Sequence, residues 1–324
     1  MRVVVIGGTG HIGTFLVPRL VRAGHEVVSL SRGRSPRYAD DPAWGEVREV
    51  VVDRDATERD GTFARTVADV EADAVVDLIC FTPESAATLV EGLRGRTGHL
   101  LHCGSIWRHG PSLRLPVTEA NGAPPVGEYG IAKAAIAAHL ASETASGGLV
   151  TTTLHPGHIV GPGWHPIGPL GNLDPGVWWR LSAGDPIVLP GLGAEAMHHV
   201  HADDVAQAFE LALADRDAVA GEDLDVVAPS ALTVRGYLEI AASWFGQRAM
   251  IEHVSWERFR GETPAEHADA SWEHLSRSHV VSIDKARRLI GYAPRYEPDE
   301  AVLESLRWLV EHDRLDIARP LLDR

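Results

Sequence analysis

The sequence predicts an α/β fold: a doubly wound parallel sheet with helices on both faces, followed by a smaller C-terminal region. Two observations predict this fold. Apolar runs alternate with amphipathic stretches up to about residue 155. The first run, Arg2–Ile6, breaks into a turn with glycines at 7, 10 and 13, where an amphipathic helix begins. A chain of 324 residues is long enough for one large domain or two.

The N-terminal half predicts six strands and three helices. Val50–Val52 and Ala74–Val76 are apolar without alternation, which is typical of strands covered on both faces. We expect strands at 2–6, 26–30, 47–52, 74–79, 98–103 and 149–154, with helices near 12–23, 84–94 and 130–146.

The amino-acid composition of the sequence changes after Pro156. Gly157–Gly193 is dense in Gly, Pro and Trp, so we expect loops to dominate there. Helices are expected at 203–215, 233–244 and 299–312, whereas the polar segment 257–278 is interpreted as a mobile lid or a surface excursion. The predicted regions are 1–156 and 157–324, with segments near 197–227 and 279–284 returning to the first region.

The glycine-rich turn predicts a phosphate-binding site. Its glycines allow a tight turn, close approach of the backbone to a pyrophosphate, and close packing of the helix on the strand, with the anion at the helix N-terminus. The pattern is G-x-x-G-x-x-G, one residue longer than the commoner dinucleotide pattern. The candidate cofactor-binding residues here are Gly7, Thr9, Gly10, His11, Ile12 and Gly13.

The end of the second strand favours NADP over NAD. NAD-preferring folds usually carry an acidic residue at this position, but this chain has Ser31, Arg32 and Arg34, which suit a 2′-phosphate. Solvated surface arginines are the alternative. Asp53, at the end of the third strand, is expected to meet the adenine, although an ordinary turn residue would fit the same position.

A candidate catalytic set follows the fifth strand. Tyr129 and Lys133 are four residues apart at the start of a predicted helix, so they share one face. A phenol with a pKa of about 10 needs a nearby positive charge to act in proton transfer at neutral pH. Ser105 lies at a strand end that faces the ligand crevice in such sheets, where it can donate to a carbonyl oxygen.

This combination of motifs resembles the extended short-chain dehydrogenase/reductases, also called the NAD-dependent epimerase/dehydratase family, which have a Rossmann-type fold. Leu154–Pro162, His199–Ala206 and Asp284–Pro294 look like further signatures of that family. The resemblance implies that Ser105, Tyr129 and Lys133 are catalytic, and that residues 1–156 bind NAD(P) while 157–324 mainly bind substrate. The cofactor contacts assigned beside the nicotinamide are Leu78, Lys133, Pro156 and His158.

Departures from the family pattern narrow the expected reaction. Ile106 and Trp107 stand where dehydratases carry carboxyl groups, so elimination of water is disfavoured. Met197 stands where nucleotide-sugar enzymes carry an arginine. The candidate substrate residues are Phe81, Trp107, His109 and Trp164. Together with the expected NADP site, these residues favour an NADP-dependent oxidoreductase that acts on a small, apolar or aromatic carbonyl compound or alcohol.

Two alternatives stay open at this point. An epimerase would use the same three residues for transient oxidation by a tightly held NAD(P). A nucleotide-sensing or RNA-associated protein of the atypical branch, related to chloroplast stem-loop RNA-binding proteins, would lack catalysis. No metal site is expected: of His198, His199 and His201, only the last two share a strand face, and no third ligand is evident.

Composition restricts the partners. The 30 basic and 45 acidic residues give a formal charge of −15, which disfavours nucleic acid. The two cysteines, Cys80 and Cys103, form no disulfide framework, and no signal peptide or membrane span is predicted, so we expect a cytoplasmic protein. The expected partner is a small-molecule substrate, and the resemblance is compatible with a homodimer.

Overall fold

Seven parallel strands form the central sheet of the structure, a computed structural model that describes residues 1–34 and 37–322. Their order is β3 (Arg48–Val51), β2 (Glu26–Ser31), β1 (Arg2–Ile6), β4 (Ala74–Asp77), β5 (His99–Cys103), β6 (Thr151–Pro156) and β11 (Asp223–Val226). The strand order reverses between β1 and β4, which is where such sheets bind ligands. The predicted fold class is confirmed.

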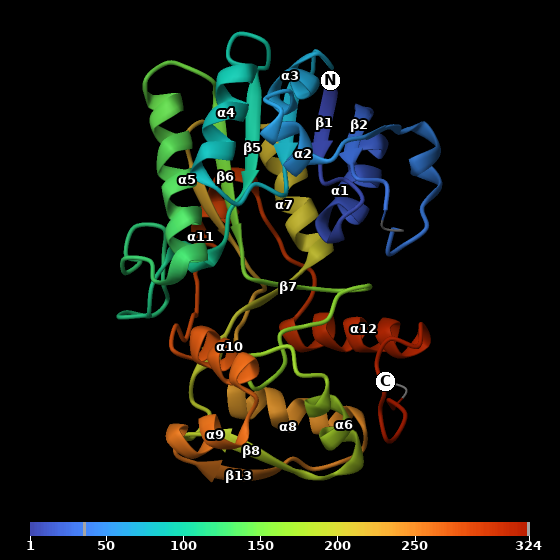
Figure 1. Cartoon of the computed structure of the whole chain (residues 1–324), viewed down its shortest axis with the longest axis vertical. Coiled ribbons are helices and arrows are strands. Elements are labelled where there is room, and N and C mark those ends of the chain that lie inside the picture. Colours follow the sequence, from blue (N-terminus) through green and yellow to red (C-terminus); the bar gives the residue numbers. More distant parts are fainter. Residues whose placement is uncertain (35–36, 323–324) are drawn as a thin grey trace.

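Helices cover both faces of the sheet (Figure 1). Val3 and Val5 pack in the core beneath α1 (His11–Arg22), α7 (Ala202–Ala214) and α11 (Asp284–Ile290). Val4 and Ile6 point to the opposite core, beneath α3 (Phe63–Ala68), α4 (Pro83–Leu93) and α5 (Gly127–Ala145). Since both faces are buried, these strands read as continuous apolar runs.

The strand and helix boundaries differ from the expectations in a few places. The strand expected at 149–154 runs from Thr151 to Pro156, because β6 pairs with β5 on one side and β11 on the other. Its threonine side chains donate to backbone carbonyl groups, as Thr151 does to Leu140 at 2.7 Å. The six-residue helices α2 (Arg54–Arg59) and α3 escaped prediction because they are too short to show a helical period.

The C-terminal region lies below the sheet in Figure 1 and has its own core. Trp178, Tyr237, Trp244 and Phe259 are buried there. The expectation that loops dominate 157–193 was wrong in part, since a helix and two strands form within this range. The elements of the region are α6 (Gly176–Ala183), β8 (Pro186–Pro190), β9 (Ala196–Met197), β12 (Leu232–Thr233), α8 (Val234–Trp244), β13 (Met250–Val254), α9 (Trp256–Glu262), α10 (Ala265–Leu275) and α12 (Pro298–Glu311).

The polar segment 257–278 folds as α9 and α10, two helices with mostly exposed or half-buried side chains. Phe259 and Leu275 anchor the two helices in the C-terminal core. The two cores meet where β7 (His158–Val160) pairs in parallel with β10 (His199–His201). We propose the division near residue 156 on this basis. Among the described residues, no helix combines the length and hydropathy needed to cross a membrane.

The glycine turn between β1 and α1 is fixed by steric limits. Gly7 has φ of +87°, in the left-handed region that favours glycine. A Cβ atom on Gly13 would lie 2.2 Å from the carbonyl oxygen of Gly8, which leaves no room for any side chain. Glycine at position 13 therefore sets how closely α1 packs on the turn.

Gly13→Ala should destabilise the protein, because the added methyl group meets backbone atoms that cannot move aside. We expect a loss of about 3 kcal/mol in the free energy of unfolding, measured by urea titration. Gly45→Ala is the matched control, since a Cβ atom there meets nothing within 4 Å, and it should change stability by less than about 0.5 kcal/mol. Equal effects of the two substitutions would contradict this packing argument.

Candidate active site

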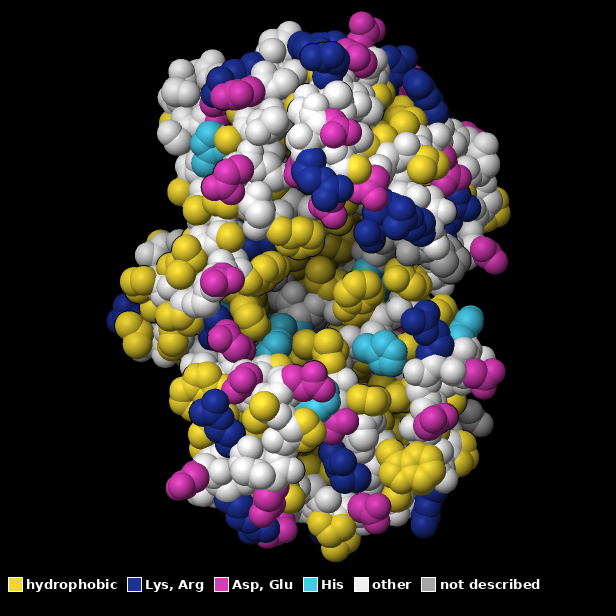
Figure 2. Space-filling model, viewed as in Figure 1, with side chains coloured by type: hydrophobic (Ala, Val, Ile, Leu, Met, Phe, Trp, Pro, Cys, Tyr) yellow, Lys and Arg dark blue, Asp and Glu magenta, His cyan; other side chains and the backbone are white. Residues whose placement is uncertain are grey.

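A cleft of about 830 Å³ lies at the carboxyl ends of the sheet strands, between the sheet and the C-terminal region. Figure 2 shows the hollow between the two halves, with hydrophobic and histidine side chains around it. The structure brings most of the expected site residues to this cleft. Those that line it are Gly7, Thr9, Gly10, His11, Ile12, Ser31, Arg32, Arg34, Leu78, Phe81, Ser105, Trp107, Tyr129, Lys133, Pro156, His158 and Trp164.

The glycine turn forms the part of the cleft that fits a pyrophosphate. The backbone amide of Gly10 donates to Gly7 at 2.9 Å, and α1 begins at the next residue with no acidic side chain in its first turn. A Cβ atom on Gly10 would lie 3.1 Å from the Gly7 oxygen, so only a bare backbone leaves this cradle open. The free amides and the positive end of α1 suit an anion.

Basic side chains stand at the adenosine end of the cleft. Arg32 and Arg34 are exposed, and Ser31 accepts a hydrogen bond from the backbone amide of Gly33 at 3.3 Å. Arg34 lies 3.9 Å from Asp53, with 76% of its side chain exposed, so this weak pair leaves the guanidinium accessible. These groups fit the phosphate end of a dinucleotide.

Two residues expected to contact the cofactor do not line the cleft. The Asp53 carboxylate caps the N-terminus of α2 by accepting from the amide of Ala56 at 3.1 Å. Its neighbours Val52, Arg54 and Asp55 face the cleft instead. Gly13 packs on Gly8 and acts through the shape of the turn.

Lys133 is buried beneath the floor of the cleft. Its ammonium group donates to the carbonyl oxygens of Cys80 and Cys103, both at 2.7 Å. Burial lowers the pKa of Lys133, and the two carbonyl groups compensate for part of the lost hydration. The ammonium nitrogen lies 5.7 Å from the centroid of the Tyr129 ring, which places the cation beneath the phenol.

Tyr129 projects into the cleft from the first turn of α5. The residue is 42% exposed overall, but its desolvated hydroxyl has a pKa raised to about 12; the Cys103 thiol adds to the rise and a hydrogen bond with Ser105 opposes it. At neutral pH the hydroxyl is therefore protonated and can donate. The Tyr129 ring lies edge-on to Trp107, with centroids 5.8 Å apart.

Ser105 is held by a buried network behind the cleft. Its backbone amide donates to Nδ1 of His155 at 3.2 Å, so Nε2 of that ring carries the proton in the neutral form and faces Asp223 at 3.3 Å. Arg108 donates to Asp223 and lies 3.0 Å from the same histidine nitrogen. The network leaves the Ser105 hydroxyl in the cleft, where it accepts from the amide of Trp107 at 3.2 Å.

His109, expected to contact substrate, lies outside the cleft. Its ring is buried and Nε2 lies 3.2 Å from a carboxylate oxygen of Asp225 on β11. The side chain points into the protein because an imidazole can satisfy that buried carboxylate. We therefore correct the expected role: His109 supports the loop after β5.

Aromatic rings line the cleft both beside the glycine turn and near Lys133. Trp164 stacks on His11 with centroids 5.0 Å apart and planes 9° apart. Phe81 lies with its centroid 4.9 Å from the ammonium of Lys133. Phe81 and Trp107 give the part of the cleft near Lys133 and Tyr129 flat apolar walls, whereas Trp164 lies beside the glycine turn.

Some lining residues were missed in the sequence. Arg54 is buried and pairs with Asp77 at 2.8 Å, a contact between residues 23 positions apart. His274 reaches the cleft from α10, and Tyr38 from the segment before β3. A lone histidine in a polar segment carries no sequence signal for a binding site.

The three histidines near residue 200 have separate partners. Nδ1 of His198 accepts from the amide of Val281, and Nε2 of His199 lies 3.1 Å from the carbonyl oxygen of Ile167. His201 lies 3.0 Å from Glu304. Within residues 1–34 and 37–322, no group of His, Cys, Asp or Glu has the geometry of a metal site.

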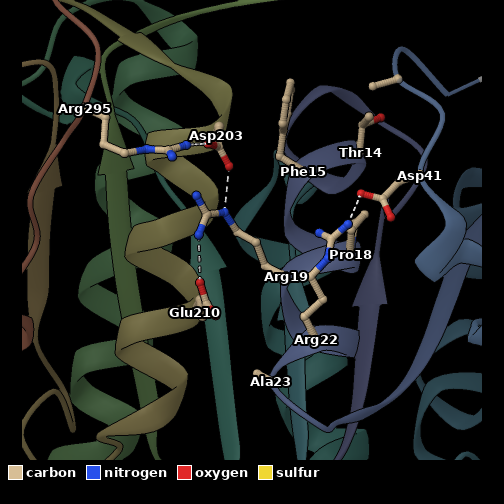
Figure 3. A pocket seen from close by; sticks show the side chains of 11 residues that line it. Thr14, Phe15, Pro18, Arg19, Arg22, Ala23, Asp41, Asp203, Glu210 and Arg295 are labelled. Carbon is tan, nitrogen blue, oxygen red and sulfur yellow. Dashed lines mark hydrogen bonds and ion pairs between the residues drawn. The ribbon is translucent and has the colours of Figure 1, made fainter.

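A second cavity of about 530 Å³ lies between α1 and α7 (Figure 3). The charged side chains that line this cavity form ion pairs with one another. Arg19 donates to Asp203 at 2.6 Å and to Glu210 at 3.0 Å, and Arg295 also pairs with Asp203. These ion pairs join two helices that are far apart in the sequence and leave no uncompensated charge for a ligand, so we assign this cavity a structural role.

The sheet, the glycine turn and the cleft define a class of dinucleotide-binding α/β enzymes. The chain belongs to the NAD dependent epimerase/dehydratase family, whose model matches residues 3–226. The family expectation is confirmed. The enzyme class is that of NAD(P)-dependent oxidoreductases and epimerases.

Individual relatives extend this comparison. The chain is 35% identical over 216 residues to the 2'-dehydrokanamycin reductase of Streptomyces kanamyceticus, a match that covers 66% of this chain and 58% of the reductase. It is 24% identical over 317 residues to the chloroplast stem-loop binding protein of 41 kDa b of Arabidopsis thaliana, covering 94% of this chain and 78% of that protein. The epimerase Mth375 of Methanothermobacter thermautotrophicus has the same fold, with a TM-score of 0.73 at 19% identity over 96% of this chain and 92% of that one.

Buried histidines should make the protein unstable to mild acid. Burial lowers the pKa of His99, His198, His199 and His279 to about 4, whereas an unfolded histidine titrates near pH 6.5. The unfolded chain therefore binds more protons as the pH falls from about 6.5 towards 4, and each histidine lowers the free energy of unfolding by about 1.4 kcal/mol per pH unit. Urea titrations at stepped pH measure this slope.

The slope can be assigned by substitution. His99→Gln should reduce this slope by about 1.4 kcal/mol per pH unit, the contribution of one histidine, since the glutamine does not titrate. His312→Gln is the control, because that ring is exposed. A stability that stays constant between pH 7 and 5 would contradict the neutral state of the buried rings.

Proposed function

We propose that the protein is an NADP-dependent oxidoreductase that interconverts a small carbonyl compound and its alcohol, with Ser105, Tyr129 and Lys133 as its catalytic residues. One observation carries the proposal: these three side chains, which come from two elements, lie together at the carboxyl ends of β4 and β5, inside the cleft. The 35% identical relative is named a reductase, which supports the same reaction class.

Side chains of this protein carry out the proton transfer. When bound, the nicotinamide dinucleotide supplies the hydride for reduction and accepts it for oxidation. The hydroxyl of Ser105 donates a hydrogen bond to the substrate carbonyl oxygen and polarises it. Tyr129 gives its proton to that oxygen as the carbon is reduced, and the ammonium of Lys133 stabilises the phenolate left behind. A tyrosine that is protonated at neutral pH suits the direction of reduction.

The choice of NADP rests on the adenosine end of the cleft. Arg32 and Arg34 can make charge-assisted hydrogen bonds to a 2′-phosphate, and Ser31 adds a hydroxyl. NAD lacks that phosphate, which leaves Arg34 with only its weak pair to Asp53. NAD-preferring folds usually carry an acidic residue at the end of the second strand. Among the described lining residues, Asp55 supplies a carboxylate, but it belongs to α2 and does not end the second strand.

The lining of the reacting part of the cleft supports a substrate with a flat apolar face. Trp107 and Phe81 provide the walls beside Tyr129 and Lys133. Met197, buried in β9, stands at the position where nucleotide-sugar enzymes of this family carry an arginine. We therefore propose a small carbonyl compound with an apolar or aromatic face in preference to a nucleotide sugar.

Tyr129→Phe should lower kcat for carbonyl reduction by about 10² to 10⁴-fold, because the phenyl ring cannot donate a proton. Oxidation of NADPH in the presence of a ketone panel, followed by absorbance, gives the rate. Tyr296→Phe is the control, since that ring stacks on His201 outside the cleft. Unchanged turnover in Tyr129→Phe would refute the triad, whereas product formation without net NADPH consumption would indicate an epimerase.

Arg32→Glu should reverse the charge offered to the 2′-phosphate. We expect the ratio of kcat/KM for NADPH to that for NADH to fall by at least about tenfold. Arg288→Glu, an exposed arginine on α11, should leave the ratio unchanged. A wild-type protein that binds NADH as tightly as NADPH would show that these arginines do not choose the nucleotide.

A further inference from the structure

The end of α10 places a buried arginine against the loop that follows Ser105. Arg277 is 1% exposed, and it comes two residues after the helix ends, where the chain leaves the C-terminal region. Its guanidinium group stacks on the indole of Trp107, with Cζ 3.9 Å from the ring centroid. A cation that is removed from water and stacked on an indole favours one orientation of both groups.

The same guanidinium group holds the start of α5. It donates to the carboxylate of Glu273 at 2.7 Å, to the backbone carbonyl of Glu273, and to the carbonyl oxygen of Val126 at 2.8 Å. Val126 is the residue that caps α5 at its N-terminus. Gly127 follows with φ of +74°, and a Cβ atom there would lie 3.4 Å from Nη2 of Arg277. The arginine therefore fixes the backbone that leads into the first turn of α5.

Trp107 connects Arg277 to both reacting groups. The backbone amide of Trp107 donates to the hydroxyl of Ser105 at 3.2 Å, and the indole lies edge-on to Tyr129 with centroids 5.8 Å apart. A Cβ atom on Gly130 would lie 2.5 Å from the carbonyl oxygen of Trp107, so α5 packs directly on this loop. Contacts of Arg277 thus reach the first turn of α5 by two routes, through the indole and through the cap of the helix.

Stability alone does not account for an arginine at this position. Its Nε is shielded from solvent and has no hydrogen-bond partner among the described residues, which is unfavourable. Apolar side chains of similar volume often replace buried ion pairs without loss of stability. The carboxylate of Glu273 is 45% exposed, so it would stay hydrated without Arg277. What arginine adds is a planar group that stacks and donates in fixed directions.

We infer that Arg277 is a positioning residue for the proton transfer. By holding the indole of Trp107 and the entry to α5, it keeps the hydroxyl of Tyr129 directed at the carbonyl oxygen that Ser105 polarises. The inference rests on the proposed function and adds to it a residue of the C-terminal region. Lys133 holds α5 one turn later, from the ends of the sheet strands.

Arg277→Met tests this role, because methionine fills space without a charge or a donor. We expect kcat for carbonyl reduction by NADPH to fall by at least about tenfold, whereas the Kd of NADPH should change by less than about twofold, since Arg277 does not line the cleft. Arg277→Lys keeps a cation and should recover part of the loss. Arg258→Met is the matched control: this half-exposed arginine of α9 also pairs with glutamates, and its loss should leave kcat unchanged.

Combination with Tyr129→Phe separates positioning from general support of the fold. If Arg277 acts through Tyr129, Arg277→Met should lower kcat by less than about twofold in the Tyr129→Phe background. Glu273→Gln provides a milder change at a half-exposed position, in case Arg277→Met does not fold. It loosens the guanidinium group and should lower kcat about threefold in the wild type, but not in Tyr129→Phe.

The outcomes distinguish this inference from the proposed function. Equal losses of kcat with and without Tyr129, or an unchanged kcat in a folded Arg277→Met or in Glu273→Gln, would overturn the positioning role while the proposed reaction stands. Undiminished ketone reduction by Tyr129→Phe alone would refute the proposed reaction and the positioning role together.

Discussion

The position of the candidate site depends on the buried ammonium group of Lys133. Its two hydrogen bonds tie α5 to the ends of β4 and β5 through Cys80 and Cys103. An ammonium out of water is costly, and these two carbonyl groups supply the compensation. Because the lysine is fixed, the first turn of α5 is fixed as well, and Tyr129 stands beside Ser105. The apolar packing of α5 against the sheet and this polar contact therefore determine one geometry together.

The cleft lies where the hydrophobic core of the sheet and the separate core of the C-terminal region meet. The sheet and its helices supply the half that fits a dinucleotide, and the C-terminal core supplies the half around His274. The short pairing of β7 with β10 carries His158 and His199 to the junction. The cleft therefore lies between a half built on the glycine turn and a half contributed by the C-terminal core.

Local spacing was enough to predict six of the seven strands of the central sheet, the glycine turn, and the common position of Ser105, Tyr129 and Lys133 in the cleft, because each depends on a strand end or a helix turn. The edge strand β11 was not predicted. Contacts between distant segments could not be predicted. His109 has its partner Asp225 at a separation of 116 residues, and nothing near His109 in the sequence marks it as buried. Asp53 fits an adenine contact and a helix cap equally well by sequence, and only the course of α2 decides between them.

The support beneath Ser105 makes the candidate site depend on one edge of the sheet. His155 holds the serine amide, and the orientation of His155 depends on Asp223 in the edge strand β11, 115 residues after Arg108. Local opening of that edge would release the serine loop, whereas the glycine turn follows β1 in the interior of the sheet and would keep its shape.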